Sequence, residues 1–352
     1  MDDDTRHRLR LRAQLLSGTP ARTSEAVVTR LLAVQGQDGR GARLAIRSRS
    51  RGVSATDVDA ALTDRRSLVI TWLNRGTLHL TAADDYWWLH PLTTPQLKVG
   101  SERRLRQEGV SPRQAARGID VVAAAVDSEP QTRAQLRAAL ERAKVPTARQ
   151  AFIHVVFAAS LQGFVVRGPM IGSEHAFVSP STWLGKAPRP LDRADALARL
   201  AKRYLAGHGP ATADDLARWA GITLLDARAA LDATCDELMY DGALALLADD
   251  AARRAPRLPA PRLLGAFEPV LLGWISRDAV IGPHRTLVTN NGLFRAFAMV
   301  GGRAVATWGL AGDTVSIKAF EPIDDETRAA LARDAAAVLA FLGTAGSQAV
   351  FI

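Results

Sequence analysis

The fold is decided by a short apolar stretch, Leu68-Val69-Ile70-Thr71-Trp72, followed by Asn74-Arg75-Gly76 and then by Thr77-Leu78-His79-Leu80. The first run has the composition of a strand, the middle residues favour a tight turn, and the last run predicts the return strand. Helical patterns precede this hairpin, at residues 5–16, 24–34, 42–50 and 56–62. Helix, turn, helix and hairpin in this order predict a winged helix.

The same order of elements occurs a second time. Thr132 stands three residues before Gln135, and Thr147 stands three residues before Gln150. This is the spacing of a capping box, so each threonine predicts a helix start. The helix expected from Thr147 leads into a strand at residues 164–167. A second winged helix is therefore predicted.

A third set of elements follows. Residues 191–205 have a helical pattern, Thr212 with Asp215 predicts the start of the next helix, and residues 223–232 predict another. Residues 238–247 then predict two strands around an Asp-Gly turn. We therefore expect three winged helix-turn-helix units in tandem.

Beyond Pro261 the pattern changes to strands, which we expect at residues 270–275, 285–289, 293–300, 303–308 and 314–320. A helix at residues 326–342 and a last strand at 348–352 complete this part. The predicted fold class is α+β, with a small C-terminal β-barrel or curled sheet. The predicted domains are residues 1–110 (first winged helix), 111–190 (second winged helix), 191–262 (third winged helix) and 263–352 (β-rich domain).

Composition narrows the class of protein. The 352 residues are 47% apolar and 23% charged, which is ordinary for a soluble globular chain. No apolar run reaches membrane-spanning length, and residues 1–5 lack the pattern of a signal peptide. We expect a cytoplasmic, nucleoid-associated protein with no membrane partner.

Metal, disulfide and cofactor chemistry have no sequence signature. Cys235 is the only cysteine, so no disulfide can form within the chain. The seven histidines are scattered without ligand spacing, and no phosphate-binding loop or nucleophile elbow is present. We expect no metal and no cofactor.

The charge balance favours a polyanionic partner. Lys and Arg number 45 against 36 Asp and Glu, a net charge of +9. Such an excess helps a protein to associate with a phosphate backbone. Genome composition can explain the preference for Arg over Lys, but it does not explain the net excess.

Four motifs carry a resemblance to a known family. Residues 32–40, with Gln35-Gly36-Gln37 at their centre, resemble the Gln-x-Gln signature of AlkZ-like DNA glycosylases. Residues 71–80 look like the first wing of that family, and residues 266–273 and 291–295 resemble motifs of its C-terminal barrel. Two departures are visible. Gly36 stands where the family has a residue with a side chain, and Glu268-Pro269 stands where it commonly has Asp-Pro.

The resemblance implies that Gln35 and Gln37 are at the centre of catalysis, with Asp38 as a further candidate. Alkylation at N7 makes guanine cationic, so the base leaves easily and neutral amides can hold the water and stabilise partial charge. Residues two apart in an extended turn project to the same side, so both amides could face one sugar. The alternatives are that Gln35 caps a helix end, that Gln37 is a solvated loop residue, and that Asp38 caps the helix near Gly41.

The DNA-contact candidates lie next to these motifs. Arg43 and Arg47 lie on one face of a predicted helix. This face is expected to contact phosphates, and the alternative is that it is only solvated. His79 could instead be a structural histidine that contacts no DNA. The Asn-Asn-Gly segment could simply form a turn, since these residues are common in turns. The full set of predicted DNA contacts is Arg40, Arg43, Arg47, Asn74, Arg75, His79, Asn290, Asn291 and Arg295.

The resemblance predicts a monofunctional DNA glycosylase that releases cationic N7-alkylated purines, including bulky adducts and interstrand crosslinks. Its expected role is DNA repair or self-resistance to a genotoxic natural product. The expected partner is double-stranded DNA carrying such lesions, and we expect a monomer. The five lysines stand outside the motifs, so no lysine nucleophile is predicted. The alternative is a non-enzymatic winged-helix DNA-binding protein, such as a transcriptional regulator.

Overall fold

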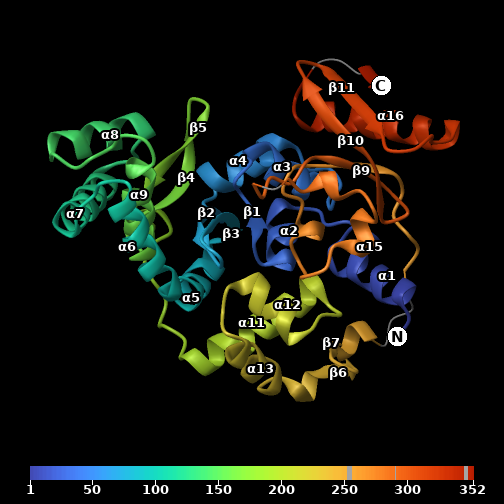
Figure 1. Cartoon of the computed structure of the whole chain (residues 1–352), viewed down its shortest axis with the longest axis horizontal. Helices are drawn as coiled ribbons and strands as arrows, with labels where there is room; N and C mark the ends of the chain where they lie inside the picture. The colour runs from blue at the N-terminus through green and yellow to red at the C-terminus, as the bar shows by residue number, and fades with distance from the viewer. Residues whose placement is uncertain (252–255, 290, 345–347) are drawn as a thin grey trace. The chain divides into compact units, whose positions relative to one another are not determined.

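The computed structural model describes residues 1–251, 256–289, 291–344 and 348–352 (Figure 1). The chain divides into two compact units. The first unit consists of Met1–Val58, Leu197–Trp219 and Thr223–Ile352, and the second of Asp59–Ala196 and Ala220–Ile222. This division falls inside the predicted domains 1–110 and 191–262, and the four finer domains stay predictions.

The N-terminal elements follow the predicted helical patterns. Side-chain caps fix two of the helix starts, because Asp2 accepts a hydrogen bond from the N–H of Thr5 and Thr23 accepts one from the N–H of Ala26. The elements are α1 (Asp3–Ala13), α2 (Ser24–Leu31), β1 (Val34–Gln35), α3 (Gly39–Arg47) and α4 (Ala55–Thr63).

The third predicted set is also present as helices and a hairpin. Thr212 and Asp215 cap each other's backbone N–H groups, and Thr223 caps the next helix. The elements are α11 (Arg193–His208), α12 (Ala213–Ala220), α13 (Leu224–Asp232), η2 (Cys235–Glu237), β6 (Leu238–Asp241), β7 (Leu244–Leu247) and α14 (Ala248–Ala251).

The C-terminal strands form one open sheet in the order β12-β11-β10-β9-β8. Only the β11–β12 pair is parallel. The sheet does not close into a barrel among the described residues, so the barrel alternative is wrong. Helix α16 contacts β8 and β12. The elements are β8 (Arg262–Leu264), η3 (Pro269–Leu271), α15 (Asp278–Ile281), η4 (Arg285–Leu287), β9 (Phe297–Val300), β10 (Arg303–Ala311), β11 (Thr314–Ala319), α16 (Asp325–Phe341) and β12 (Gln348–Phe351).

Two strands predicted in this part are absent. Residues 270–275 and 285–289 contain the short 3₁₀ turns η3 and η4 instead. Pro269 starts the first of these turns, and Val270, Leu271 and Leu287 are buried. Their apolar character reflects burial in a turn, which periodicity does not distinguish from a short strand.

The second unit contains a sheet with β3, β2, β4 and β5 in that order, all antiparallel. The predicted hairpin is confirmed, with Leu68 opposite Ala82 and Leu73 opposite Thr77. The elements are β2 (Leu68–Leu73), β3 (Thr77–Ala82), α5 (Ala83–Thr93), η1 (Pro95–Leu97), α6 (Lys98–Gln107), α7 (Pro112–Ser128), α8 (Arg133–Arg142), α9 (Ala151–Leu161), β4 (Val166–Ile171), β5 (Glu174–Val178) and α10 (Pro180–Trp183).

Helix α9 is the centre of the second unit's core. It packs against α6, α7 and β2, and Phe152, Val155 and Val156 have no exposed surface. The capping box of Thr132 with Gln135 is confirmed at the start of α8. The one predicted at Thr147 is wrong, because α9 begins at Ala151 and the Thr147 hydroxyl donates to Glu141 instead. Within the parts that the structure describes, no helix is long and apolar enough to cross a membrane.

Candidate active site

A strained turn leads into the Gln-x-Gln segment. Helix α2 ends at Leu31, and Leu32 has φ 65° and ψ −45°. The N–H of Ala33 donates to the carbonyl of Leu31 at 2.8 Å, which makes Leu32 the centre of a γ-turn. A residue with a side chain adopts this conformation only where its surroundings fix it, and Leu31 and Leu32 are fully buried. The turn redirects the chain from α2 into β1.

The two glutamines contact each other. Gln35 is 6% exposed, and its Nε2 donates to Oε1 of the exposed Gln37 at 2.6 Å. Both side chains therefore lie on the same side of the segment, as their spacing predicts. Helix α2 ends four residues before Gln35, and its C-cap is Leu32. The Gln37 Nε2 donates to no described residue, so it is available to a ligand or a water.

Asp38 is the N-cap of α3. Its Oδ1 accepts a hydrogen bond from the N–H of Gly41 at 2.5 Å, which confirms the capping alternative. Its other oxygen, Oδ2, accepts no hydrogen bond from the residues that the structure describes. One carboxylate thus ends the Gln-x-Gln segment, fixes the following helix and keeps one free acceptor.

Close backbone contact holds the start of α3 against the 266–273 motif. A Cβ atom at Gly41 would lie 2.3 Å from the carbonyl oxygen of Ala266, so no larger residue fits there. Gly265 also approaches closely, because a Cβ on it would lie 3.0 Å from Cα of Gly41. The residue that directly follows the Gln-x-Gln motif therefore packs against the start of the 266–273 motif.

Glu268 of the same motif has no exposed surface and forms an ion pair with the equally buried Arg49. Arg49 also donates to Gln14 Oε1 at 3.0 Å and to the carbonyl of Ala45 at 2.9 Å. Sequence reasoning did not single out Arg49. The pair joins the chain just beyond α3 to the 266–273 motif, so Glu268 has a structural role here.

Comparison with known proteins identifies the family that these elements belong to. The model of the family described as DNA glycosylase AlkZ-like matches residues 28–341. The chain belongs to the AlkZ-like DNA glycosylase family. Among solved structures, the Streptomyces sahachiroi DNA glycosylase AlkZ is similar to it over 100% of both chains, with 25% identity and a TM-score of 0.82. A search of curated protein sequences finds no match.

Membership of the AlkZ-like family makes DNA the substrate and directs attention to the basic side chains near the glutamines. Arg40 is exposed and pairs with no described residue, whereas Arg43 Nη1 donates to the Gly39 carbonyl at 2.9 Å. Arg47 is different. Its guanidinium forms two hydrogen bonds with the Asp334 carboxylate, at 2.7 and 2.8 Å, and is only 11% exposed. Arg47 therefore anchors α3 to α16, and its guanidinium is not exposed beside that of Arg43 as the shared helical face predicted.

The first hairpin also differs from expectation. Asn74, in its turn with φ 56°, is 1% exposed, and His79 is buried. Neither side chain is exposed at a wing tip, and DNA contact by either residue stays a prediction. Arg75 is half-buried and remains a predicted contact. The Nδ1 of His79 lies 2.9 Å from the Thr77 carbonyl and donates to it.

We expect His79 to make the protein less stable in acid. Burial lowers the pKa of His79 to about 4, although its bond to the Thr77 carbonyl opposes the shift. Between pH 6.5 and about 4 the unfolded chain binds a proton that the folded chain refuses, so stability falls as the pH falls through this window. Urea unfolding at several pH values should show a shallower slope for His79→Asn, by about 1.4 kcal/mol per pH unit. Equal slopes for the two proteins would contradict the burial of a neutral imidazole.

The segment at residues 289–295, which contains the predicted contacts Asn291 and Arg295, lies next to the 266–273 motif. The N–H of Thr289 donates to the Leu293 carbonyl at 2.9 Å, and the rings of Phe294 and Phe267 are 5.8 Å apart. Asn291 and Arg295 are exposed and remain predicted DNA contacts. Asn290 lies outside the described residues.

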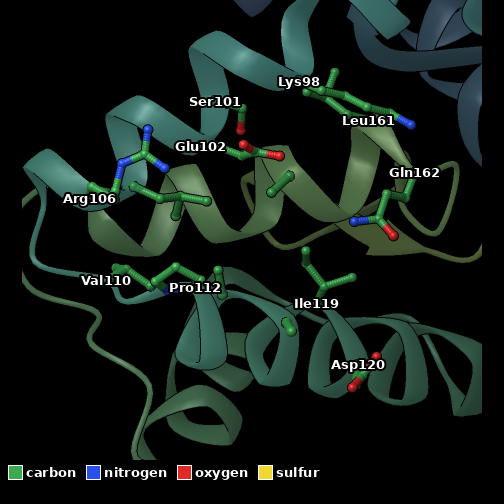
Figure 2. Close-up of a pocket in the computed structure, with 14 residues that line it drawn as sticks. Lys98, Ser101, Glu102, Arg106, Val110, Pro112, Ile119, Asp120, Leu161 and Gln162 are labelled. Carbon is green, nitrogen blue, oxygen red and sulfur yellow. The ribbon is translucent and has the colours of Figure 1, made fainter.

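A cavity of about 630 Å³ lies elsewhere, within the second unit between α6, α7 and α9 (Figure 2). Leu105 and Ile119 form part of its apolar lining, while Lys98 and Glu102 bring opposite charges to it. It includes none of the predicted site residues. Among the residues that the structure describes, no group of three or more His, Cys, Asp or Glu could hold a metal.

Proposed function

We propose that the protein is a monofunctional DNA glycosylase that hydrolyses the N-glycosidic bond of cationic N7-alkylated purines. The observation that carries the proposal is the hydrogen bond between Gln35 and Gln37, at the segment that matches the family's signature. The two groups in contact are neutral amides rather than the paired carboxylates of sugar hydrolases. Amides suffice where the leaving base already carries a positive charge and needs no protonation.

Each side chain has a distinct part in this reaction. Gln35 is buried and fixes Gln37 by donating to its carbonyl oxygen, which leaves the Gln37 Nε2 to donate to the attacking water. The free Asp38 Oδ2 accepts a proton of that water and opposes the positive charge that develops on the sugar. No lysine stands in the segment, so water is the nucleophile and the DNA strand stays intact after base release.

Bulky adducts and interstrand crosslinks are within the proposed substrate range. Gln37 is exposed, so a base can reach it without full extrusion into a closed pocket. We assign the protein to DNA repair or to self-resistance against a genotoxic natural product. Its three sets of helices and hairpins act as tandem winged helices, on a monomer that works on chromosomal DNA in the cytoplasm.

The charge of the leaving base provides the test. Duplexes with one N7-methylguanine, one 7-methyl-7-deazaguanine or one N7-linked interstrand crosslink would be incubated with enzyme in excess. We expect release from the N7-methylguanine and crosslinked duplexes and none from the deaza duplex, whose base has the same shape but no charge. Equal release of neutral bases would reject the proposal. Tight binding without any release would indicate a DNA-binding regulator instead.

Asp38 can be tested separately from its capping role. Asparagine is as good an N-cap as aspartate, so Asp38→Asn should keep α3 and the melting temperature unchanged. We expect it to lower the single-turnover rate about a hundredfold, because the neutral amide cannot take a proton from water. Asp38→Ala should show the same loss of rate and, in addition, about 1 kcal/mol lower stability. A fully active Asp38→Asn enzyme would limit Asp38 to capping.

A further inference from the structure

Arg133, Arg137 and Arg167 of the second unit each place a guanidinium group over an aromatic ring. The Cζ of Arg133 and that of Arg137 lie 4.7 and 4.9 Å from the centroid of the Phe152 ring. The Cζ of Arg167 lies 5.1 Å from the Trp72 ring and 4.9 Å from the Phe177 ring. We call Arg133, Arg137 and Arg167 the arginine cradle. Stacking covers the flat faces of a guanidinium and leaves the N–H groups at its edge to bind an acceptor.

Little within the protein neutralises the arginine cradle. The side chains of Arg133 and Arg167 form no ion pair and no hydrogen bond with the described residues, and Nε of Arg167 is buried without an acceptor. Arg137 donates to the Thr147 carbonyl at 2.7 Å, which is a neutral partner. The carboxylate that acts on Arg167 is that of Glu174, and it accepts the backbone N–H of Arg133 at 3.3 Å.

Holding these charges together has a cost. Burial lowers the pKa of Arg167 to about 10, the neighbouring Arg133 lowers it further, and Glu174 opposes both. A buried guanidinium N–H without an acceptor also loses the hydrogen bond that it makes in water. A bound anion would relieve both costs, since it supplies oxygen acceptors and negative charge at once.

The backbone holds the arginine cradle in place. Gln131 and Phe177 exchange two backbone hydrogen bonds of 2.8 Å, which fix the chain before α8 to β5. Arg133 is the first residue of α8, and the capping box of Thr132 with Gln135 fixes that helix start. Arg137 follows one turn later on the same helix. The guanidinium groups therefore stand on regular elements rather than on a free loop.

We infer that the arginine cradle binds a phosphodiester group of the DNA substrate. A guanidinium edge matches the two non-bridging oxygens of a phosphodiester, and the groups provide no base-specific pattern. Contact with the DNA backbone also suits this unit, because most of α9, the third helix of the predicted second winged helix, is buried and cannot enter a groove. The inference rests on DNA as the substrate of the family and not on the identity of the lesion.

The salt dependence of binding to undamaged duplex DNA tests this inference. Each phosphate contact adds about 0.9 to the slope of log K against log salt concentration. Arg133→Ala should reduce the magnitude of this slope by about 0.9, the value for one phosphate contact, and weaken binding about fivefold at moderate salt. Arg167→Met, which keeps an apolar side chain between the two rings, should have the same effect. Arg142→Ala is the matched control, because it removes the same charge from the exposed end of α8.

Equal slopes for Arg133→Ala, Arg142→Ala and wild type would overturn the inference. A second outcome would also overturn it. If the DNA slopes are equal and inorganic phosphate raises the melting temperature of wild type but not of Arg133→Ala, the arginine cradle is a site for free phosphate rather than for DNA. Undamaged DNA undergoes no base release. Failure of this test is therefore distinct from failure of the proposed glycosylase reaction.

Discussion

Replacing both Gln35 and Gln37 with alanine is expected to lower the single-turnover rate of base release about a thousandfold. Removing one preorganised hydrogen-bond donor from a reaction centre costs between about a hundredfold and a thousandfold. Gln35 acts through Gln37, since its Nε2 donates to the Gln37 carbonyl at 2.6 Å. The two single replacements should therefore each lose nearly as much as the double, as groups that act as a unit do.

Affinity for DNA separates this loss from a general defect. The double variant should bind a lesion-containing duplex within about twofold of wild type, because its Lys and Arg contacts to phosphates are unchanged. Gln37 is exposed, so Gln37→Ala should also melt at the wild-type temperature. A double variant that releases base at a rate close to that of wild type would show that the Gln-x-Gln segment does not perform the chemistry.

Glu268→Ala is expected to lower the free energy of unfolding of the first unit by about 3 to 5 kcal/mol. The replacement leaves the Arg49 guanidinium buried and unpaired, which is costly in an interior of low polarity. Arg49→Met should cost a similar amount, because it leaves Glu268 buried alone. Urea unfolding, followed by tryptophan fluorescence, measures both values.

The double replacement Arg49→Met with Glu268→Met provides the control. The native pair is incompletely satisfied, since Nε of Arg49 and Oε2 of Glu268 have no partner within the described part of the chain. An apolar pair of similar volume should therefore recover most of the lost stability. If the double variant is as unstable as the sum of the two single variants, the pair is not an independent buried unit.

Local chemistry made much of the fold predictable. Thr132 and Thr212 each start a helix where their spacing to the next polar residue predicts it, and Thr223 caps the helix expected at residues 223–232. The Asn74–Gly76 turn and the Asp241-Gly242 turn each join the two strands that flank them. These signals depend on a few neighbouring residues, so they are visible in the sequence.

Burial and partners could not be predicted in the same way. Arg47 and Arg43 have the same helical spacing, but only Arg47 meets Asp334, which is 287 residues away along the chain. Arg49 is one of many arginines, and nothing near it in the sequence marks it as fully buried. His79 lies in a strand of the predicted hairpin, but the residues that bury it come from the tertiary fold. The same-side arrangement of Gln35 and Gln37 followed from their spacing, whereas the strained turn at Leu32 did not.

The most direct test of the central claim is detection of the released base. A duplex with a single N7-methylguanine would be incubated with excess wild-type enzyme, and the solution would be analysed by mass spectrometry for free 7-methylguanine. We expect one equivalent of free base and a strand that stays intact until the abasic site is cleaved by alkali. A stable protein–DNA complex with no free base would contradict the assignment of the reaction to this protein.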